Sequence, residues 1–222
     1  MSVSRDNERL KLVRKLHDKR WRDKLGLFFV EGEDAVAAAT AEPVDLLRAG
    51  EDVEASLLAE VASAPHPPRI VGVYRRADLP GWEERDATLA LWRLADPGNV
   101  GTLIRTADAF GAAVALSDGC ADPTSPKALR ASAGSIWRVP LGDWARVDST
   151  RTRIALVAHG GKPLASVPLD GRVTLLLGAE RAGLPPDVER DVDATIPIAG
   201  AESLNVAATG AIALYELARR QT

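Results

Sequence analysis

The chain has 222 residues, of which 46% are hydrophobic and 27% charged, a composition that excludes a disordered chain and suits one large or two small globular domains. Its formal net charge of −3 excludes a protein that binds nucleic acid through an overall positive charge. The single cysteine, Cys120, excludes an intramolecular disulfide, and the three histidines are too scattered for a metal-binding motif, so we expect no metal.

The sequence shows no targeting segment. The N-terminus lacks an apolar core, and no apolar run approaches the roughly 18 residues that a membrane-spanning helix needs. We therefore expect a soluble, cytoplasmic protein.

Helices and strands alternate over the first 76 residues. A helical pattern of apolar residues opens the chain and ends at Gly26, and short apolar segments follow it. This alternation predicts a small α/β domain over residues 1–76. Its predicted strands cover residues 27–30, 44–50 and 69–76, and its later predicted helices cover residues 33–41 and 56–63.

The first 24 residues are basic, with nine Lys and Arg against four Asp and Glu. Such a patch can supply phosphate contacts even when the whole protein is acidic. An ordinary solvated helix face explains the same charges equally simply. On the first interpretation, the candidate RNA contacts are Arg9, Arg14, Lys15, Lys19, Arg20 and Arg22.

Residues 77–86 are charged, contain Pro and Gly, and have no clean period, which predicts a linker. Beyond it, several nearly continuous apolar runs are typical of a parallel sheet that is buried on both faces. We expect a second α/β domain over residues 87–222. Its predicted strands cover residues 87–94, 112–117, 153–161 and 172–180, and its predicted helices cover residues 100–111, 126–134 and 207–220.

Three glycine-rich loops lie where ligands bind in open parallel sheets, beyond the carboxyl ends of strands. In the first, Gly98 and Gly101 flank Asn99 at the start of a helix, and Arg105 follows one turn later. A helix start suits an anion, and an arginine beside it suits a phosphodiester. An ordinary strand–helix turn with a surface arginine explains the same residues.

In the second loop, Gly178 and Gly183 flank Glu180 and allow the backbone to approach a ligand closely. The third loop, residues 196–205, places turn-forming residues directly before the last helix. Ser203 is the expected N-cap of that helix, and Asn205 would lie in its first turn and face the mouth of the loop. Neither loop identifies a reaction by itself.

Taken together, the loops resemble the motifs of the SpoU/TrmH family of RNA 2′-O-ribose methyltransferases, within the SPOUT class. N-x-G-x-x-x-R starts at Asn99, G-x-E-x-x-G starts at Gly178, and P-x-x-G-x-x-x-S-L-N-V starts at Pro197, in the order and spacing of the family. The resemblance covers about residues 89–220. Residues 3–76 are similar to the small RNA-substrate-binding domain that many members carry in front.

The resemblance implies an α/β fold with a parallel sheet and a C-terminal deep trefoil knot, preceded by the small α/β substrate-binding domain. It also implies a homodimer that binds S-adenosylmethionine in the knot and methylates a ribose 2′-hydroxyl in rRNA or tRNA. The loop of residues 196–205 would wrap the cofactor, and the helix after it would lie in the dimer interface.

The resemblance further implies roles for individual residues. Arg105 would be the catalytic arginine near the target ribose and its phosphate, and Asn99 would orient the substrate or Arg105. Glu180 would hold the motif loops together, while Ser203 and Asn205 would complete the site. The cofactor would contact, largely through backbone groups, residues Ala158, Gly178, Gly183, Ile196, Ile198, Gly200 and Leu204.

This chain departs from the family pattern at three places. Ile198 stands where Met is common, Ala207 stands where Ser is common, and the segment of residues 137–153 is short for the helix usually present there. None of these changes touches an implied catalytic residue, so activity remains the prediction. Arg130, in the sequence RASAG, would contact RNA or serve the structure.

Two other functions remain as alternatives. A non-catalytic RNA-binding or ribosome-assembly protein that retained the fold would bind RNA without transferring a methyl group. A nicotinamide-dependent dehydrogenase would need a G-x-G-x-x-G sequence after its first strand and an acidic residue about 20 positions later, and this chain has neither.

Overall fold

The computed structural model describes residues 7–63 and 66–221. The chain divides into two compact units, one made of residues 1–79 and 122–137 and the other of residues 80–121 and 138–222. The division at residues 79 and 80 falls inside the predicted linker. The segment 122–137, however, packs in the first unit, although sequence analysis placed it in the second domain.

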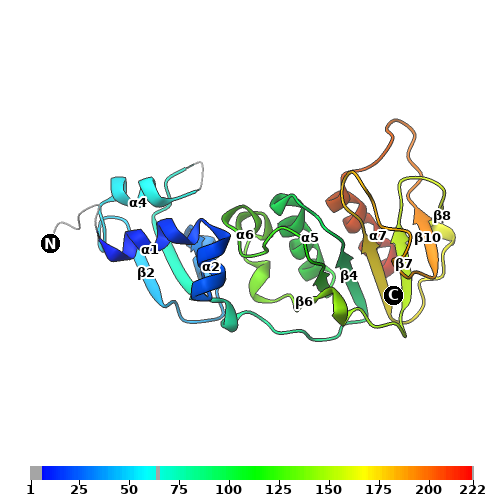
Figure 1. The fold of residues 1–222 in the computed structure, drawn as a ribbon, viewed down its shortest axis with the longest axis horizontal. Coiled ribbons are helices and arrows are strands. Elements are labelled where there is room, and N and C mark those ends of the chain that lie inside the picture. Colours follow the sequence, from blue (N-terminus) through cyan, green and yellow to red (C-terminus); the bar gives the residue numbers. More distant parts are fainter. Residues whose placement is uncertain (1–6, 64–65, 222) are drawn as a thin grey trace. The chain divides into compact units, whose positions relative to one another are not determined.

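The first unit is a small α/β layer (Figure 1). Its three strands form an antiparallel sheet in the order β1-β3-β2. The elements are α1 (Glu8–Leu16), α2 (Lys19–Leu25), β1 (Leu27–Glu31), α3 (Glu33–Ala37), β2 (Asp45–Arg48), α4 (Ala55–Val61), β3 (Ile70–Arg75), η1 (Arg76–Asp78), α6 (Pro126–Ser132) and η2 (Ser135–Trp137).

The predicted N-terminal helix is two helices. In α1, Leu10, Val13 and Leu16 point into the core and are fully buried. The helix ends there because Asp18 adopts an extended conformation and caps a new helix, its side chain accepting a hydrogen bond from the backbone N–H of Arg20. Gly26 ends α2 in the left-handed conformation, with φ of 64°.

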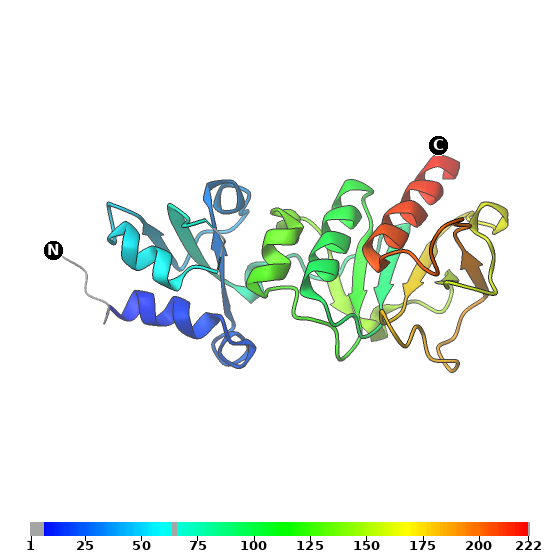
Figure 2. The same cartoon turned by 90° about the horizontal axis from the view of Figure 1, so that it is seen from above.

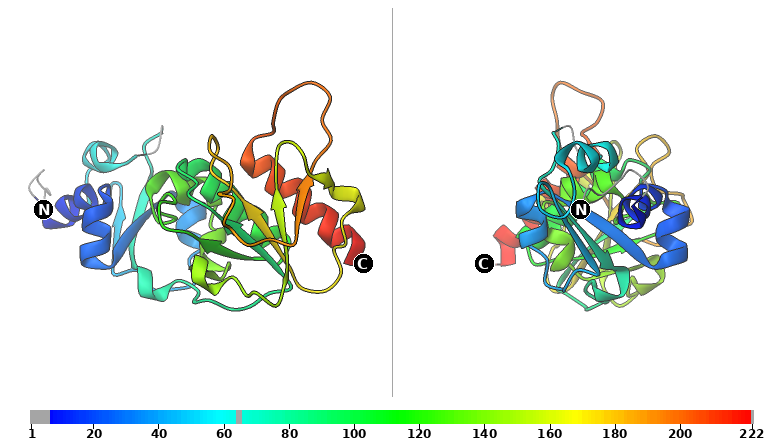
Figure 3. Two further views of the ribbon diagram at one scale, coloured as in Figure 1. Left: turned by 45° about the vertical axis from the view of Figure 1, so that its right-hand side comes forward. Right: turned by 90° about the vertical axis from the view of Figure 1, so that its left-hand side faces the viewer.

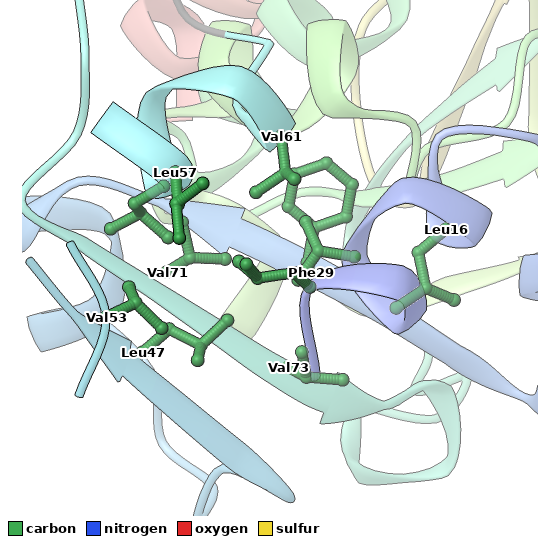
Figure 4. Packing of buried hydrophobic residues seen from close by; sticks show 11 residues of the cluster. Leu16, Phe29, Leu47, Val53, Leu57, Val61, Val71 and Val73 are labelled. Carbon is green, nitrogen blue, oxygen red and sulfur yellow. The ribbon is translucent and has the colours of Figure 1, made fainter. Parts of the chain in front are cut away.

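The core of the first unit lies between its sheet and the helices α1 and α4, as Figure 4 shows. Phe29 of β1, Leu47 of β2 and Val71 of β3 each expose 1% or less of their surface. Burying a side chain of this size stabilises a fold by about 1.5–3 kcal/mol, so this cluster accounts for much of the unit's cohesion.

Residues 122–137 are held in the first unit by charge and by aromatic packing. Asp122 accepts from Arg22 at 2.9 Å and from Arg76 at 2.6 Å, and its own side chain is only 7% exposed. At the other end, the Trp137 ring packs 4.8 Å from Tyr74 and 5.5 Å from Phe28. The segment is therefore an integral part of the first unit.

The second unit contains a parallel sheet of seven strands in the order β6-β5-β4-β9-β7-β10-β8, which confirms the predicted fold class. The short strands β6, β8 and β10 were not anticipated. The elements are β4 (Ala87–Leu91), α5 (Pro97–Ala109), β5 (Ala113–Leu116), β6 (Leu141–Asp143), η3 (Trp144–Arg146), β7 (Thr152–Leu156), β8 (Lys162–Pro163), η4 (Leu164–Ser166), β9 (Val173–Leu177), β10 (Val192–Thr195) and α7 (Val206–Gln221).

Helices α5 and α7 lie side by side on one face of this sheet (Figure 2). They approach closely at Gly210, where an added Cβ would lie 2.4 Å from the Cδ2 atom of Leu103. The opposite face is covered by side chains from loops and from η3, including Trp82, Trp144 and Leu184. Between residues 133 and 151 the chain forms η2, β6 and η3 but no α-helix, as the short segment predicts.

Among the described residues, no helix has the length and apolar character needed to cross a membrane.

Candidate active site

A cavity of about 690 Å³ opens beyond the carboxyl ends of β7, β9 and β10. Its walls are formed by the ends of those strands, by the turn of residues 178–184 and by the loop of residues 196–205. That loop arches from β10 to the start of α7 (Figure 3). The cavity therefore lies at the edge of the sheet where open α/β folds bind ligands.

A chain of side-chain hydrogen bonds joins the three motif loops beside the cavity. Asn99 donates through Nδ2 to Oε1 of Glu180 at 3.1 Å, and Asn205 donates through Nδ2 to Oδ1 of Asn99 at 3.1 Å. Asn99 lies in the first turn of α5, Glu180 in the turn after β9, and Asn205 directly before α7. Residues 81 and 106 positions apart are thus brought into one cluster.

The environment of Glu180 favours its ionised form. Partial burial acts to raise the pKa of this carboxyl group, but hydrogen bonds act in the opposite direction. They come from its own backbone N–H, the Asn99 amide and the backbone N–H groups of Ala95 and Asp96, and together they lower the pKa below its ordinary value. A carboxylate held this way fastens the loop after β4 to the turn after β9.

The N-cap of the last helix is Asn205, not Ser203, which corrects the sequence prediction. The Asn205 Oδ1 atom accepts from the backbone N–H groups of Ala207 at 2.8 Å and Ala208 at 3.3 Å. Ser203 lies exposed in the loop, two residues before it. The Asn205 side chain therefore performs two tasks, since its oxygen caps α7 and its amide group holds Asn99.

The turn of residues 178–184 requires glycine at its first position. Ala179 and Gly183 exchange backbone hydrogen bonds of 3.2 and 2.8 Å, which closes a narrow loop. A Cβ on Gly178 would lie 2.3 Å from the carbonyl carbon of Gly183, a distance no side chain tolerates. Gly183 has a φ of 66°, in the left-handed region that favours glycine.

Most of the residues assigned to the cofactor surround the cavity. Gly200 is the exception, because it lies in the arch but not on the cavity wall. The six that line it are Ala158, Gly178, Gly183, Ile196, Ile198 and Leu204. Sequence reasoning missed the polar residues His159, Arg181, Thr195, Glu202 and Thr209, which also line it. Their positions, at or just after the end of a strand, in the loop before α7 or in the first turn of α7, are the signal that could have indicated them.

The cavity fits a ligand such as S-adenosylmethionine. Its volume lies within the range of about 300–1,000 Å³ that small-molecule and cofactor sites occupy. Apolar walls from Leu177, Ile196 and Leu204 alternate with backbone segments that are not part of a helix or sheet. These segments leave N–H and C=O groups for a polar ligand, as the family resemblance implies.

Arg105 projects from α5 and does not line the cavity. It is exposed and forms no hydrogen bond or ion pair with any residue that the structure describes. Its guanidinium group is thus free to meet a ligand from outside the chain. No group of His, Cys, Asp and Glu among the described residues is arranged to hold a metal ion.

The basic residues that the sequence analysis singled out are of two kinds. Arg22 is 3% exposed, and its donors are used by Asp122 and by the carbonyls of Leu16 and His17, so it is not free to contact RNA. Others are also paired, Arg9 with Asp45, Arg14 with Glu60, Lys19 with Asp23 and Arg130 with Glu31. Lys15 and Arg20 form no ion pair with any acidic side chain that the structure describes.

Known proteins are similar to this chain in sequence. A family model described as the SpoU rRNA Methylase family matches residues 86–215. The 23S rRNA (guanosine(2553)-2'-O)-methyltransferase RlmP of Bacillus subtilis is 32% identical over 247 residues, covering 96% of this chain and 97% of the relative.

Solved structures agree over nearly the whole chain. An AdoMet-bound rRNA methyltransferase from Sinorhizobium meliloti has a TM-score of 0.86 at 29% identity and covers 99% of this chain and 97% of that one. The SpoU methyltransferase AviRb from Streptomyces viridochromogenes, also with AdoMet, has a TM-score of 0.84 at 26% identity and covers 97% and 98%. These similarities confirm the predicted S-adenosylmethionine-dependent RNA methyltransferase: the chain belongs to the SpoU rRNA methylase family.

Proposed function

We propose that this enzyme methylates a ribose 2′-hydroxyl of ribosomal RNA. The Bacillus subtilis relative, which is similar over nearly the full length of both chains, is named for this reaction at a guanosine of 23S rRNA. That similarity favours ribosomal RNA over transfer RNA, and such a substrate fits the cytoplasmic location expected from the sequence. The observation within the chain that supports catalysis is the hydrogen-bonded cluster of Asn99, Glu180 and Asn205 beside the cavity.

In this proposal, the cofactor supplies an electrophilic methyl group, and the chain supplies alignment. The cavity residues named above hold the cofactor through apolar contacts and backbone groups. Glu180 and Asn205 fix the Asn99 amide from both sides, so that Asn99 presents one orientation to the substrate. Holding two reactants in line lowers the barrier without any covalent step by the protein.

Arg105 is the proposed contact to the target nucleotide. Its exposed guanidinium, without an acidic partner among the described residues, can bind the phosphate next to the reacting ribose. An arginine stays protonated, so its contribution is charge and orientation near the 2′-hydroxyl rather than simple proton removal. Ser203, exposed in the loop of residues 196–205, is a further proposed residue of the site.

We also propose that the loops around the cavity are threaded into a knot. The sheet order supports this proposal, because β9 pairs with one side of β7 and β10 with the other. The chain must therefore cross β7 between these two strands. A crossing of this kind encloses a ligand with backbone rather than with long side chains.

A homodimer is proposed from the surface of α7. Ile212 is 40% exposed and Tyr215 is 58% exposed, one turn apart on the same helix. A second copy of the chain would cover this apolar pair. In such a dimer, we propose that Ser203 and Asn205 face Arg105 of the partner subunit.

The decisive experiment is transfer of a radiolabelled methyl group from S-adenosylmethionine to unmodified total RNA, followed by separation of the ribosomal and transfer RNA and nucleoside digestion of each. Label in a 2′-O-methylated nucleoside is the expected result. Label in a methylated base, or in transfer RNA alone, would contradict the proposal. RNA binding without any transfer, by enzyme that calorimetry shows to bind the cofactor, would favour the non-catalytic RNA-binding protein.

A further inference from the structure

Three cationic side chains of the first unit gather around one tryptophan. The Nζ atoms of Lys15 and Lys24 lie 5.2 and 5.0 Å from the centroid of the Trp21 ring, and the guanidinium carbon of Arg20 lies 6.0 Å from it. These distances are typical of cation–π contacts. We call these four residues the Trp21 cluster. Trp21 and Lys24 were not among the residues that the sequence indicated.

No described carboxylate lies within ion-pair distance of the cations of the Trp21 cluster, and only Lys15 has a resolved electrostatic influence on one, Glu8. Within residues 7–63 and 66–220, none of the three forms an ion pair with an acidic side chain. The nearest acidic residues in sequence are engaged elsewhere. Asp18 caps α2, and Asp23 pairs with Lys19 at 2.6 Å and with Arg76 at 2.7 Å.

The contrast with the other basic side chains is informative. The remaining cations of α1 and α2 are matched by carboxylates, some of them from distant elements, such as Asp45 for Arg9 and Asp122 for Arg22. Among the described residues of this basic segment, the unmatched positive charge is therefore concentrated at Trp21. Like charges held around one ring repel each other, and a polyanion with regularly spaced charges relieves that repulsion.

We propose that the Trp21 cluster is the contact through which the first unit binds the phosphodiester backbone of the RNA substrate. Lys15, Arg20 and Lys24 each meet a phosphate, and the Trp21 ring holds their side chains in place before RNA arrives. This inference rests on the proposed function, because it takes RNA as the substrate. Of the candidate RNA contacts that the sequence indicated, Arg9 and Arg22 then have structural roles, and RNA contact belongs to the cations of the Trp21 cluster.

The expected effect follows from counterion release. A contact with single-stranded nucleic acid contributes about 0.7 to the slope of log affinity against log salt concentration. Loss of three contacts should reduce the slope by about 2 and weaken binding on the order of 100-fold at about 0.1 M salt.

The test uses the full-length protein and a fluorescein-labelled oligouridylate, with binding followed by fluorescence polarisation between about 50 and 200 mM KCl. The variant is Lys15→Ala/Arg20→Ala/Lys24→Ala. Its matched control, Lys11→Ala/Lys19→Ala/Arg48→Ala, changes the net charge equally but removes cations that have carboxylate partners. We expect the control to change affinity by less than about threefold.

Further variants separate the parts of the cluster. Trp21→Leu should weaken binding while leaving the salt slope unchanged, because the three phosphate contacts remain. If alanines at the three cationic positions unfold the helices, glutamines there repeat the test with the polar stems retained. Unchanged binding by Trp21→Leu would refute the role of the ring.

Equal affinity and slope in the triple variant and its control would overturn the proposal. If the triple variant no longer adsorbs to anionic lipid vesicles but still binds RNA, the cluster contacts a membrane surface, and the proposal is overturned equally. Methyl transfer by the wild type to unmodified rRNA, measured in parallel, separates this inference from the proposed function. If the wild type transfers methyl groups and the triple variant binds RNA as its control does, only the role of the Trp21 cluster is refuted. If the triple variant loses RNA binding but the wild type transfers no methyl group, only the proposed reaction is refuted.

Discussion

The double task of Asn205 can be divided by two substitutions. Asn205→Ala removes the oxygen that caps α7 and the amide that holds Asn99. Loss of an N-cap costs about 1 kcal/mol, within a range of 0.5–2 kcal/mol. In a chain of this size, we expect the melting temperature to fall by about 2–4 °C for each kcal/mol.

Asn205→Asp keeps the capping oxygen and places a negative charge at the start of α7, where it is favourable. It replaces the amide donor with an oxygen facing Oδ1 of Asn99, which lies 3.1 Å from the present nitrogen. The stability of this variant should stay within about 0.5 kcal/mol of the wild type. Methyl transfer should nevertheless fall about tenfold, because a loss of about 1.4 kcal/mol in positioning has that effect on a rate.

The assay is thermal unfolding followed by circular dichroism, together with single-turnover methyl transfer to rRNA. We expect Asn205→Ala to lose both stability and activity and Asn205→Asp to lose activity alone. Two results would refute the double task of Asn205: an Asn205→Asp variant that melts as early as Asn205→Ala, or one that transfers methyl groups at the wild-type rate.

Three further substitutions test other parts of the structure. Gly178→Ala forces a Cβ against the backbone of Gly183 and should abolish cofactor binding measured by calorimetry, while binding at wild-type affinity would contradict the geometry of the turn. Arg105→Ala should abolish methyl transfer yet leave cofactor affinity within about twofold, because Arg105 does not line the cavity; an active variant would refute its role. Asp122→Asn leaves Arg22 without a charge partner and should lower the free energy of unfolding in urea by about 3–5 kcal/mol at neutral pH. Burial acts to raise the pKa of Asp122, but hydrogen bonds from Thr124 and the two arginines lower it below its ordinary value. The ionised group therefore stabilises the fold above about pH 4, and this contribution disappears as the pH falls through the lowered pKa. A difference between wild type and Asp122→Asn that stayed constant down to acidic pH would contradict this account.

The elements that the sequence predicted best are those whose own composition requires burial. Strands β4 and β9 are buried along their whole length, and a run of apolar residues indicates this directly. Strand β8 has only two exposed residues, and β10 contains an aspartate, so neither resembles a strand by composition. Strand β10 forms because it pairs with β7, and β8 forms because it pairs with β10. A local sequence pattern does not reveal such pairing.

The candidate site shows the same division between local and distant information. The motif order identified Asn99, Glu180 and Asn205 as site residues, and the structure brings all three together. The assignment of the helix cap to Ser203 was wrong because Ser and Asn two positions apart are equally good caps by residue type. Only the backbone conformation, which starts α7 at Val206, decides between them.

The basic segment is where local reasoning is weakest. Charge counting treats Arg20 and Arg22 alike. Arg22, however, is buried against Asp122, 100 positions away in sequence, whereas Arg20 is exposed beside Trp21. A cation is available to RNA only if no carboxylate neutralises it first, and the neutralising carboxylates come from other elements.

The same distant pairing determines how the two units can be studied separately. Removal of residues 1–75 would seem to isolate the methyltransferase part, but residues 122–137 pack in the first unit. Such a truncation would deprive Asp122 of Arg22 and expose the Trp137 ring, which now packs against Phe28 and Tyr74. An apolar surface of this kind favours aggregation, so loss of RNA binding by the truncated chain would not report on the Trp21 cluster. Point substitutions in the intact chain are therefore the sharper test of what the first unit contributes.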